Sequence, residues 1–334
     1  MPPSDRSFSP SPLTIEFLKS LLAADMAAVD RVLRTSLDSD VALIRQVAEH
    51  IIGSGGKRLR PALLLLSARA CGYEGTRHHT LAAVVEMIHT ATLLHDDVVD
   101  DSKLRRGHAT ANETFGNSAS VLVGDFLYSR AFQQMVDQGS LRVLEILSNA
   151  TNVIAQGEVL QLINSGDPEL GEDDYLAVIR RKTAKLFAAA AQLGAVCGDA
   201  SPKVEEALEC YGMHLGAAFQ LVDDALDYSG DLDAIGKNLG DDLAEGKMTL
   251  PLIRARDVGT AEDRALLREA ITGGRLTEFT PVVAVLTRTG ALDYTRERAA
   301  GESAAAAACL DLLPDTPYRK SLLELASFAA QRTY

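Results

Sequence analysis

The chain has 334 residues, of which 47% are hydrophobic and 24% are charged, as is typical of globular proteins. Its 33 basic and 46 acidic side chains give a formal net charge of −13, which argues against a surface that binds duplex nucleic acid. Four cysteines form no C-x-x-C pair, so we expect neither a disulfide framework nor a zinc finger and favour a reducing, cytoplasmic compartment. The opening residues lack the features of a secretory signal, and no long uncharged apolar stretch occurs.

Apolar residues recur at helical spacing along the chain, beginning at about Leu13. Alternating strand patterns are nearly absent, so we predict an all-α protein with about ten or more helices. We expect residues 1–12 to form a disordered N-terminus and residues 13–334 to form one domain. Three stretches rich in glycine, aspartate and basic residues interrupt the helical pattern, at 53–61, 101–117 and 229–251. We expect the chemistry in these loops.

Two acidic clusters, at 96–100 and 223–227, share the pattern D-D-x-x-D, and each ends a long apolar helical run. Residues four apart lie on one helix face, so the outer aspartates of each cluster should project together. Like charges repel, and carboxylates at a helix C-terminus oppose the helix dipole, so a divalent cation is indicated. Oxygen ligands completed by water and phosphate are typical of Mg²⁺. The candidate metal ligands are Asp96, Asp97, Asp100, Asp223, Asp224 and Asp227.

A solvated helix end would explain one isolated acidic cluster, but two copies that each follow an apolar run favour the metal site. Basic residues add to this interpretation. The segment GGKRLRP at 55–61 places cations on a glycine turn that leads into a helix, which favours anion binding. Further cations lie beside the clusters and in the other irregular stretches: Arg105, Arg106, Lys182, Lys237 and Lys247. The pattern predicts two phosphate-bearing ligands, one held through Mg²⁺ and one held directly by lysine and arginine.

Five segments resemble the motifs of the trans-prenyl diphosphate synthases, in the same order and at similar separations. They are GGKRLRP, LLHDDVVDDSKLRRG, the pair Lys182-Thr183, FQLVDDALD and KNLGDDLAEGKMTLP. The resemblance begins at about residue 20 and is closest to the bacterial long-chain members through ATANETFGNSASVLVGDFLYSRAF, IAQGEVLQL and LPDTPYR. It implies the isoprenoid synthase fold, a single large helical bundle around a deep central cavity.

The resemblance also implies a reaction and a role for each candidate residue. An enzyme of this family condenses isopentenyl diphosphate head-to-tail onto an allylic diphosphate, here farnesyl diphosphate, using two or three Mg²⁺ ions. The ligands of the ions that hold the allylic diphosphate are Asp96, Asp100 and Asp223. The implied contacts to isopentenyl diphosphate are Lys57, Arg60, His89 and Arg106. The implied cations for the allylic diphosphate are Arg105, Lys182, Lys237 and Lys247. Facing the reacting carbons are Thr183 and Gln220.

The implied product is a long all-trans polyprenyl diphosphate, most directly octaprenyl for a ubiquinone side chain, with heptaprenyl or nonaprenyl as alternatives. The growing tail should run along the helix that bears the first cluster, past Thr92 and Ala91, whose small side chains leave the route open. Phe132 and Met135 are candidate floor residues of this tunnel. Plain core packing is the alternative explanation for both.

The resemblance further implies a homodimer, and a hydrocarbon product implies transient contact with a membrane surface at release. Three other classes share single features. An HD-type metal phosphohydrolase would use the His95-Asp96 pair but leaves the second cluster and the glycine-lysine turn unexplained. A terpene cyclase would need no site for a second diphosphate, and a non-catalytic helical scaffold would be expected to have lost aspartates or lysines from these motifs, which are all present here.

Overall fold

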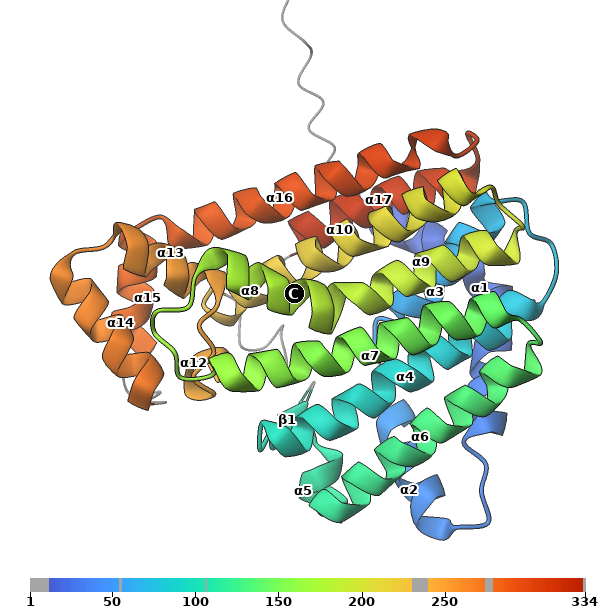
Figure 1. Ribbon diagram of the computed structural model, residues 1–334, viewed down its shortest axis with the longest axis horizontal. Coiled ribbons are helices and arrows are strands. Elements are labelled where there is room, and N and C mark those ends of the chain that lie inside the picture. The colour runs from blue at the N-terminus through green and yellow to red at the C-terminus, as the bar shows by residue number, and fades with distance from the viewer. Residues whose placement is uncertain (1–11, 54–55, 106, 230–239, 274–278, 333–334) are drawn as a thin grey trace, which may run out of the picture.

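The apolar periodicity of the sequence forms a bundle of long helices that lie roughly along one axis in the computed structural model (Figure 1). The structure describes residues 12–53, 56–105, 107–229, 240–273 and 279–332. Arg106 and Lys237, two of the predicted diphosphate ligands, lie outside these residues, as does the expected disordered N-terminus except for Pro12, where α1 begins. The all-α prediction is confirmed for the described chain.

The N-terminal half contains α1 (Pro12–Ser36), α2 (Ala42–Gly53), α3 (Leu59–Ala70), α4 (Arg77–Val99), α5 (Ala111–Phe115), α6 (Asn117–Asp137) and α7 (Leu141–Asn164). A short antiparallel hairpin of β1 (Leu104–Arg105) and β2 (His108–Ala109) follows α4. The C-terminal half contains α8 (Glu172–Ile179), η1 (Arg180–Ala184), α9 (Lys185–Cys197), α10 (Pro202–Asp227), α12 (Asp241–Ala244), α13 (Leu250–Val258), α14 (Ala261–Gly273), α15 (Phe279–Arg288), α16 (Ala291–Cys309), η3 (Leu310–Leu312) and α17 (Pro317–Gln331).

The main core lies among α3, α4, α9 and α10. Helix α9 is rich in alanine and buried over almost its whole length, as expected for a helix that is apolar on every face. Small side chains let neighbouring helices approach closely, so α9 packs against both α3 and α10. None of the described helices is long and apolar enough to cross a membrane.

The two acidic clusters lie at the C-terminal ends of α4 and α10. Both helices run toward the same end of the bundle, beside which α12 to α15 gather (Figure 1). The first cluster occupies the last turn of α4 and its C-cap, Asp100, whereas the second lies wholly within α10. The fold therefore brings two segments more than 100 residues apart to one end of the molecule.

Between α8 and α9 the chain forms a π-helical turn, η1, which carries Lys182 and Thr183. Such turns insert an extra residue into a helix and are frequent at functional sites. Glycines on two neighbouring helices let them approach η1 closely. A Cβ at Gly157 of α7 would lie 2.6 Å from the Lys182 nitrogen, and one at Gly216 of α10 would lie 2.5 Å from Ala184 Cα. Backbone packing on both sides therefore fixes the π turn in place.

We expect Gly157→Ala and Gly216→Ala each to destabilise the protein by about 1–3 kcal/mol, because the added methyl group must displace backbone. Gly301→Ala is a matched control, since Gly301 is exposed on α16 with no atom within 4 Å of the added group. That change should stabilise the helix by about 0.5–1 kcal/mol. Urea unfolding measures all three, and a Gly157→Ala protein as stable as wild type would contradict the close approach.

Candidate active site

A cavity of about 420 Å³ lies between α4, α7, α8, η1, α10 and the segment that joins α12 to α13. Both aspartate clusters line it. Asp96 and Asp100 contribute from α4, and the residues contributed from α10 are Asp223, Asp224 and Asp227. The two acidic helix ends therefore share one site and do not face separate surfaces.

The first cluster is compensated by two lysines. Lys182 Nζ lies 3.6 Å from Asp96 Oδ2 and 2.6 Å from Glu158 Oε2, and Lys247 Nζ lies 3.1 Å from Asp100 Oδ2 and also pairs with Glu245. Burial raises the pKa of Asp96, against the opposing effect of the Lys182 charge. Burial would lower the pKa of Lys247, but the nearby carboxylates raise it above its ordinary value. The acidic groups around Lys247 thus hold its ammonium charged.

Asp97 does not face the cavity. It is buried beneath the hairpin, where Oδ1 accepts hydrogen bonds from Arg105 Nη2 at 2.7 Å and Nε at 2.9 Å. Adjacent residues on a helix point about 100° apart, so Asp97 cannot share the direction of Asp96. Arg105 itself lines the cavity, which makes Asp97 an orienting partner for this cation.

A chain of hydrogen bonds joins η1 to the second cluster. Thr183 Oγ1 donates to Gln220 Oε1 at 2.9 Å, and Gln220 Nε2 donates to Asp224 Oδ1 at 2.7 Å. The Tyr175 hydroxyl donates to the other oxygen of Asp224. Burial, and next the Asp242 charge, raises the pKa of Asp224 well above its ordinary range. Asp224 is consequently a buried anchor, whereas Asp227 accepts a bond from the Asp242 backbone nitrogen at 3.3 Å.

Asp223 is paired with an arginine from the end of the chain. Arg332 Nη2 lies 3.1 Å from Asp223 Oδ1 and donates to the Phe219 carbonyl at 2.8 Å. Its guanidinium stacks on the Phe219 ring at 3.8 Å from the ring centre. The Arg332 side chain is only 3% exposed and lines the cavity. The site therefore includes a cation that follows α17.

The glycine-lysine turn reaches the same cavity from the start of α3. Lys57 is exposed, and Arg58, in the left-handed region at φ 49°, pairs with Glu86 at 3.1 Å. Arg60 Nη1 lies 3.1 Å from His89 Nε2, and its guanidinium stacks over Phe187 at 4.4 Å. The predicted contacts Lys57, Arg60 and His89 are thus grouped on one wall.

The remaining predicted residues divide between cavity and core. Thr92 lines the cavity, Ala91 and Met135 are wholly buried in hydrophobic clusters, and Phe132 is 38% exposed. His95 faces α6, with Nε2 3.2 Å from the Val121 carbonyl oxygen. It does not line the cavity wall described above, so its imidazole is not paired with Asp96 as an HD-type metal ligand would be.

Glu158, Tyr175, Glu245 and Arg332 are among the cavity residues that were not predicted from the sequence. Glu158 carries a weak local signal, because it is a lone acid in the otherwise uncharged segment IAQGEVLQL. Glu245 lies within a motif that was identified for its neighbours. Tyr175 and Arg332 carry none, since their roles depend on contacts with residues 49 and 109 positions away.

The donor set of the cavity suits a hard divalent cation, because its ligand atoms are carboxylate oxygens. Within the described residues, no three of these carboxylates offer oxygens within 4.8 Å of one another. An ion bound here would therefore take one or two carboxylates and complete its shell with water or a ligand phosphate, as is usual for Mg²⁺. The lysines beside the carboxylates are suited to the same phosphate.

The helical bundle and its cavity of opposed acidic and basic groups define an all-α enzyme class whose site accommodates diphosphate groups. Residues 41–284 match the family model described as polyprenyl synthetase, and the chain belongs to the polyprenyl synthetase family. It is 53% identical to octaprenyl diphosphate synthase of Escherichia coli, over 96% of this chain and 99% of that protein. It is 45% identical to the geranyl-diphosphate-specific all-trans-nonaprenyl-diphosphate synthase of Rhodobacter capsulatus, over 96% and 99%.

The structure is similar to a polyprenyl synthase from Caulobacter crescentus that was crystallised with calcium and isoprenyl diphosphate. The TM-score is 0.94 at 46% sequence identity, and the match covers 99% of this chain and 100% of that one. These findings confirm three predictions from the motifs: the prenyl diphosphate synthase family, the isoprenoid synthase fold and a long-chain trans-polyprenyl diphosphate synthase, which is a prenyltransferase.

Glu158 should make the stability of the metal-free protein depend on pH. Burial, and next the charge of Asp96, raises its pKa from 4.5 to about 7, against the lowering effect of Lys182. The folded chain therefore binds this proton more tightly than the unfolded chain. Its contribution to the free energy of unfolding is complete below pH 4.5 and is lost as the pH rises through about 7.

As the pH rises from 4.5 to about 7, the titration of Glu158 should lower the free energy of unfolding of wild type by about 1–3 kcal/mol. Glu158→Gln should not show this loss, because glutamine does not titrate. Urea unfolding in EDTA at a series of pH values measures the difference. Glu113→Gln, on an exposed position of α5, should keep the wild-type pH dependence. Identical profiles for Glu158→Gln and wild type would rule out this origin.

Proposed function

We propose that the enzyme adds isopentenyl diphosphate units to farnesyl diphosphate and releases octaprenyl diphosphate for a quinone side chain. The single observation that carries the chemistry is that both aspartate clusters and the basic residues opposite them line one cavity. The product length is supported by the higher identity to the octaprenyl synthase of E. coli, 53%, than to the R. capsulatus nonaprenyl synthase, 45%. Heptaprenyl and nonaprenyl remain the alternative products.

The proposed metal is Mg²⁺, with two or three ions per site. The proposed ligands are Asp96, Asp100 and Asp223, with Asp227 beside them, while Asp97 and Asp224 orient neighbouring groups through their hydrogen bonds. When bound, the ions would neutralise negative charge on the leaving diphosphate of the allylic substrate. The carboxylates already line the cavity, so their main role would be to hold the ions in position.

The basic residues would bind the two diphosphates. Lys182 and Lys247, which neutralise carboxylates in this structure, would also bind the allylic diphosphate, together with Arg105 and Lys237. Lys57, Arg60 and His89, which line the cavity, would hold isopentenyl diphosphate, and Arg106 is proposed for the same ligand from its sequence motif alone. Because fixed cations need little reorganisation, they stabilise the leaving group as its charge develops.

Thr183 and Gln220 would protect and stabilise the allylic cation. Their oxygens are held by the hydrogen bond between the two side chains and present negative dipole ends without being strong nucleophiles. An apolar, water-excluded pocket favours attack by the isopentenyl double bond over capture by solvent. The released diphosphate is the proposed acceptor of the final proton.

A homodimer is proposed, with α6 and α7 at its interface. Both helices expose apolar side chains, among them Leu122 at 66%, Val136 at 61%, Leu162 at 63% and Ile163 at 71%. An interface between two copies of the chain would cover these exposed apolar side chains. The proposed compartment is the cytoplasm, where the product would leave through transient contact with a membrane surface. No nucleic-acid partner is proposed.

The direct test is to incubate the purified protein with farnesyl diphosphate, isopentenyl diphosphate and Mg²⁺, and to size the extracted lipid by mass spectrometry. The proposal expects an eight-unit all-trans product as the main species. A main product of seven or nine units would keep the chemistry and change the length. Absence of any chain elongation would overturn the proposed function.

Asp96→Asn should lower turnover by about three orders of magnitude, because it removes a charged ligand while keeping the side-chain volume. Each factor of ten corresponds to about 1.4 kcal/mol of barrier. Steady-state release of diphosphate at saturating Mg²⁺ measures the loss. Asp137→Asn, an exposed position at the end of α6, should leave the rate unchanged. Near-normal turnover in the Asp96 variant would contradict the metal-ligand assignment.

Met135→Ala tests the proposed tunnel floor. Met135 is buried on α6, a helix that packs against α4, along which the tail is expected to grow. We expect the variant to make longer products than wild type, measured by the same lipid sizing. Gln133→Ala alters a nearby exposed position of α6 and should keep the wild-type lengths. An unchanged product distribution for Met135→Ala would show that Met135 only packs the core.

A further inference from the structure

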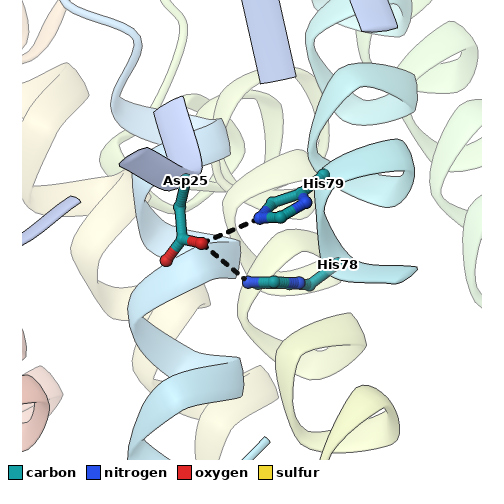
Figure 2. A group of neighbouring side chains, drawn as sticks. All are labelled: Asp25, His78 and His79. Carbon is teal, nitrogen blue, oxygen red and sulfur yellow. Dashed lines mark hydrogen bonds and ion pairs between the residues drawn. The ribbon is translucent and has the colours of Figure 1, made fainter. Parts of the chain in front are cut away.

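Three side chains that commonly bind metals converge where α1 passes the first turn of α4 (Figure 2). Asp25 of α1 directs Oδ1 between two adjacent imidazoles, at 2.8 Å from His79 Nε2 and 3.5 Å from His78 Nε2. The imidazole rings are tilted by 32° relative to each other, with centres 4.1 Å apart. Among the described residues, this is the group in which three such side chains offer ligand atoms within 4.8 Å of one another.

His78 is the second observation that points to a ligand. Its side chain is wholly buried, and neither ring nitrogen makes a hydrogen bond. A buried polar group without a partner costs about 1–3 kcal/mol, so a buried histidine in this position needs another source of stabilisation. Its Nε2 points toward Asp25 at a distance too long for a hydrogen bond (Figure 2). An ion between the two would give His78 the partner that it lacks.

The spacing suits a tetrahedral ion. Bonds of about 2.0–2.1 Å at tetrahedral angles place neighbouring ligand atoms roughly 3.3–3.5 Å apart. The distance from Asp25 Oδ1 to His78 Nε2 already has this value. The distance from Asp25 Oδ1 to His79 Nε2 would have to widen by about half an ångström. Two imidazoles and one carboxylate select zinc and neighbouring transition metals over Mg²⁺, which prefers oxygen ligands only.

The protonation states agree with this donor set. Burial lowers the pKa of His78 to about 4, so its imidazole is neutral near pH 7. Burial would raise the pKa of Asp25, but hydrogen bonds from Arg69 and His79 outweigh it and lower the pKa to about 2. Neutral imidazole and ionised carboxylate are the forms that bind metals.

Arg69 of α3 orients the Asp25 carboxylate and limits the affinity of the site for an ion. It donates from Nη2 to Asp25 Oδ1 at 2.8 Å and from Nε to Oδ2 at 3.2 Å. An ion at Oδ1 would leave the bond to Oδ2 in place, which fixes the carboxylate in the way that outer hydrogen bonds usually fix metal ligands. The positive charge nearby weakens the affinity, so the site should be weaker than a closed four-ligand zinc site.

We propose that Asp25, His78 and His79 bind one zinc-class divalent ion, with water as a fourth ligand, and that this ion ties α1 to α4. His78 and Asp96 are separated by 18 positions of one helix, or about 27 Å. The site is therefore remote from the aspartate clusters, and its role is to anchor the N-terminal helix to the bundle.

The test uses the full chain, stripped with EDTA and then dialysed against micromolar Zn²⁺ in the presence of millimolar Mg²⁺, which competes for the oxygen-only ligands of the cavity. Elemental analysis should find one zinc per chain in wild type and at least a tenfold loss in His79→Gln. His108→Gln, which changes an exposed histidine of β2, should keep the full zinc content. Zinc should also raise the melting temperature of wild type by a few degrees, since the ion binds only the folded chain.

Equal zinc contents in wild type and His79→Gln, or no zinc in wild type, would overturn the proposal. His79 is part-exposed, so its variant is expected to fold, and the metal-free melting temperature checks this. If the variant does not fold, Co²⁺ added to wild type decides the question. Strong visible absorption typical of tetrahedral cobalt supports the site, and its absence excludes it.

Discussion

The structure depends on the neutralisation of carboxylates that the fold gathers around one cavity. Asp96, Asp100 and Asp223 each meet a cation, and the three cations come from different parts of the chain: Lys182 on η1, Lys247 after α12 and Arg332 after α17. A partly buried carboxylate without a partner costs several kcal/mol. These pairs therefore hold the surrounding elements against α4 and α10, and the basic side chains that stabilise the fold are also those suited to a diphosphate.

The helical pattern of the sequence predicted much of this arrangement. Outer aspartates four residues apart were expected to share a face, and Asp96 and Asp100 do line the cavity together. The same pattern also included Asp97 among the ligands, but the structure pairs it with Arg105. Helical periodicity tells which way a side chain points. Periodicity does not predict which residue the side chain contacts, because the hairpin that carries Arg105 has no periodic pattern of its own.

Other parts of the site depend on contacts that no local pattern encodes. Arg332 reaches Asp223 across 109 positions, and Tyr175 reaches Asp224 across 49. The π turn at Arg180–Ala184 is likewise invisible in the sequence, because its residues are ordinary helix formers. Its presence follows from the glycines of α7 and α10 that allow the neighbouring backbones to approach. Charged motifs thus located the cavity, and tertiary packing decided its exact lining.

The extra residue in η1 also constrains how the chain can vary in length. Each added or removed residue turns the rest of a helix by about 100°. Between Ile179 and Lys185, such a change would rotate either Lys182 out of the cavity or the alanine-rich surface of α9 away from α3 and α10. The loop between α7 and α8 is fixed in a different way, because Gly166 donates to the Gly246 carbonyl and Arg256 donates to the carbonyls of Pro168 and Leu170. A length change inside η1 would therefore rotate whole helices, whereas a length change in this loop would break local contacts.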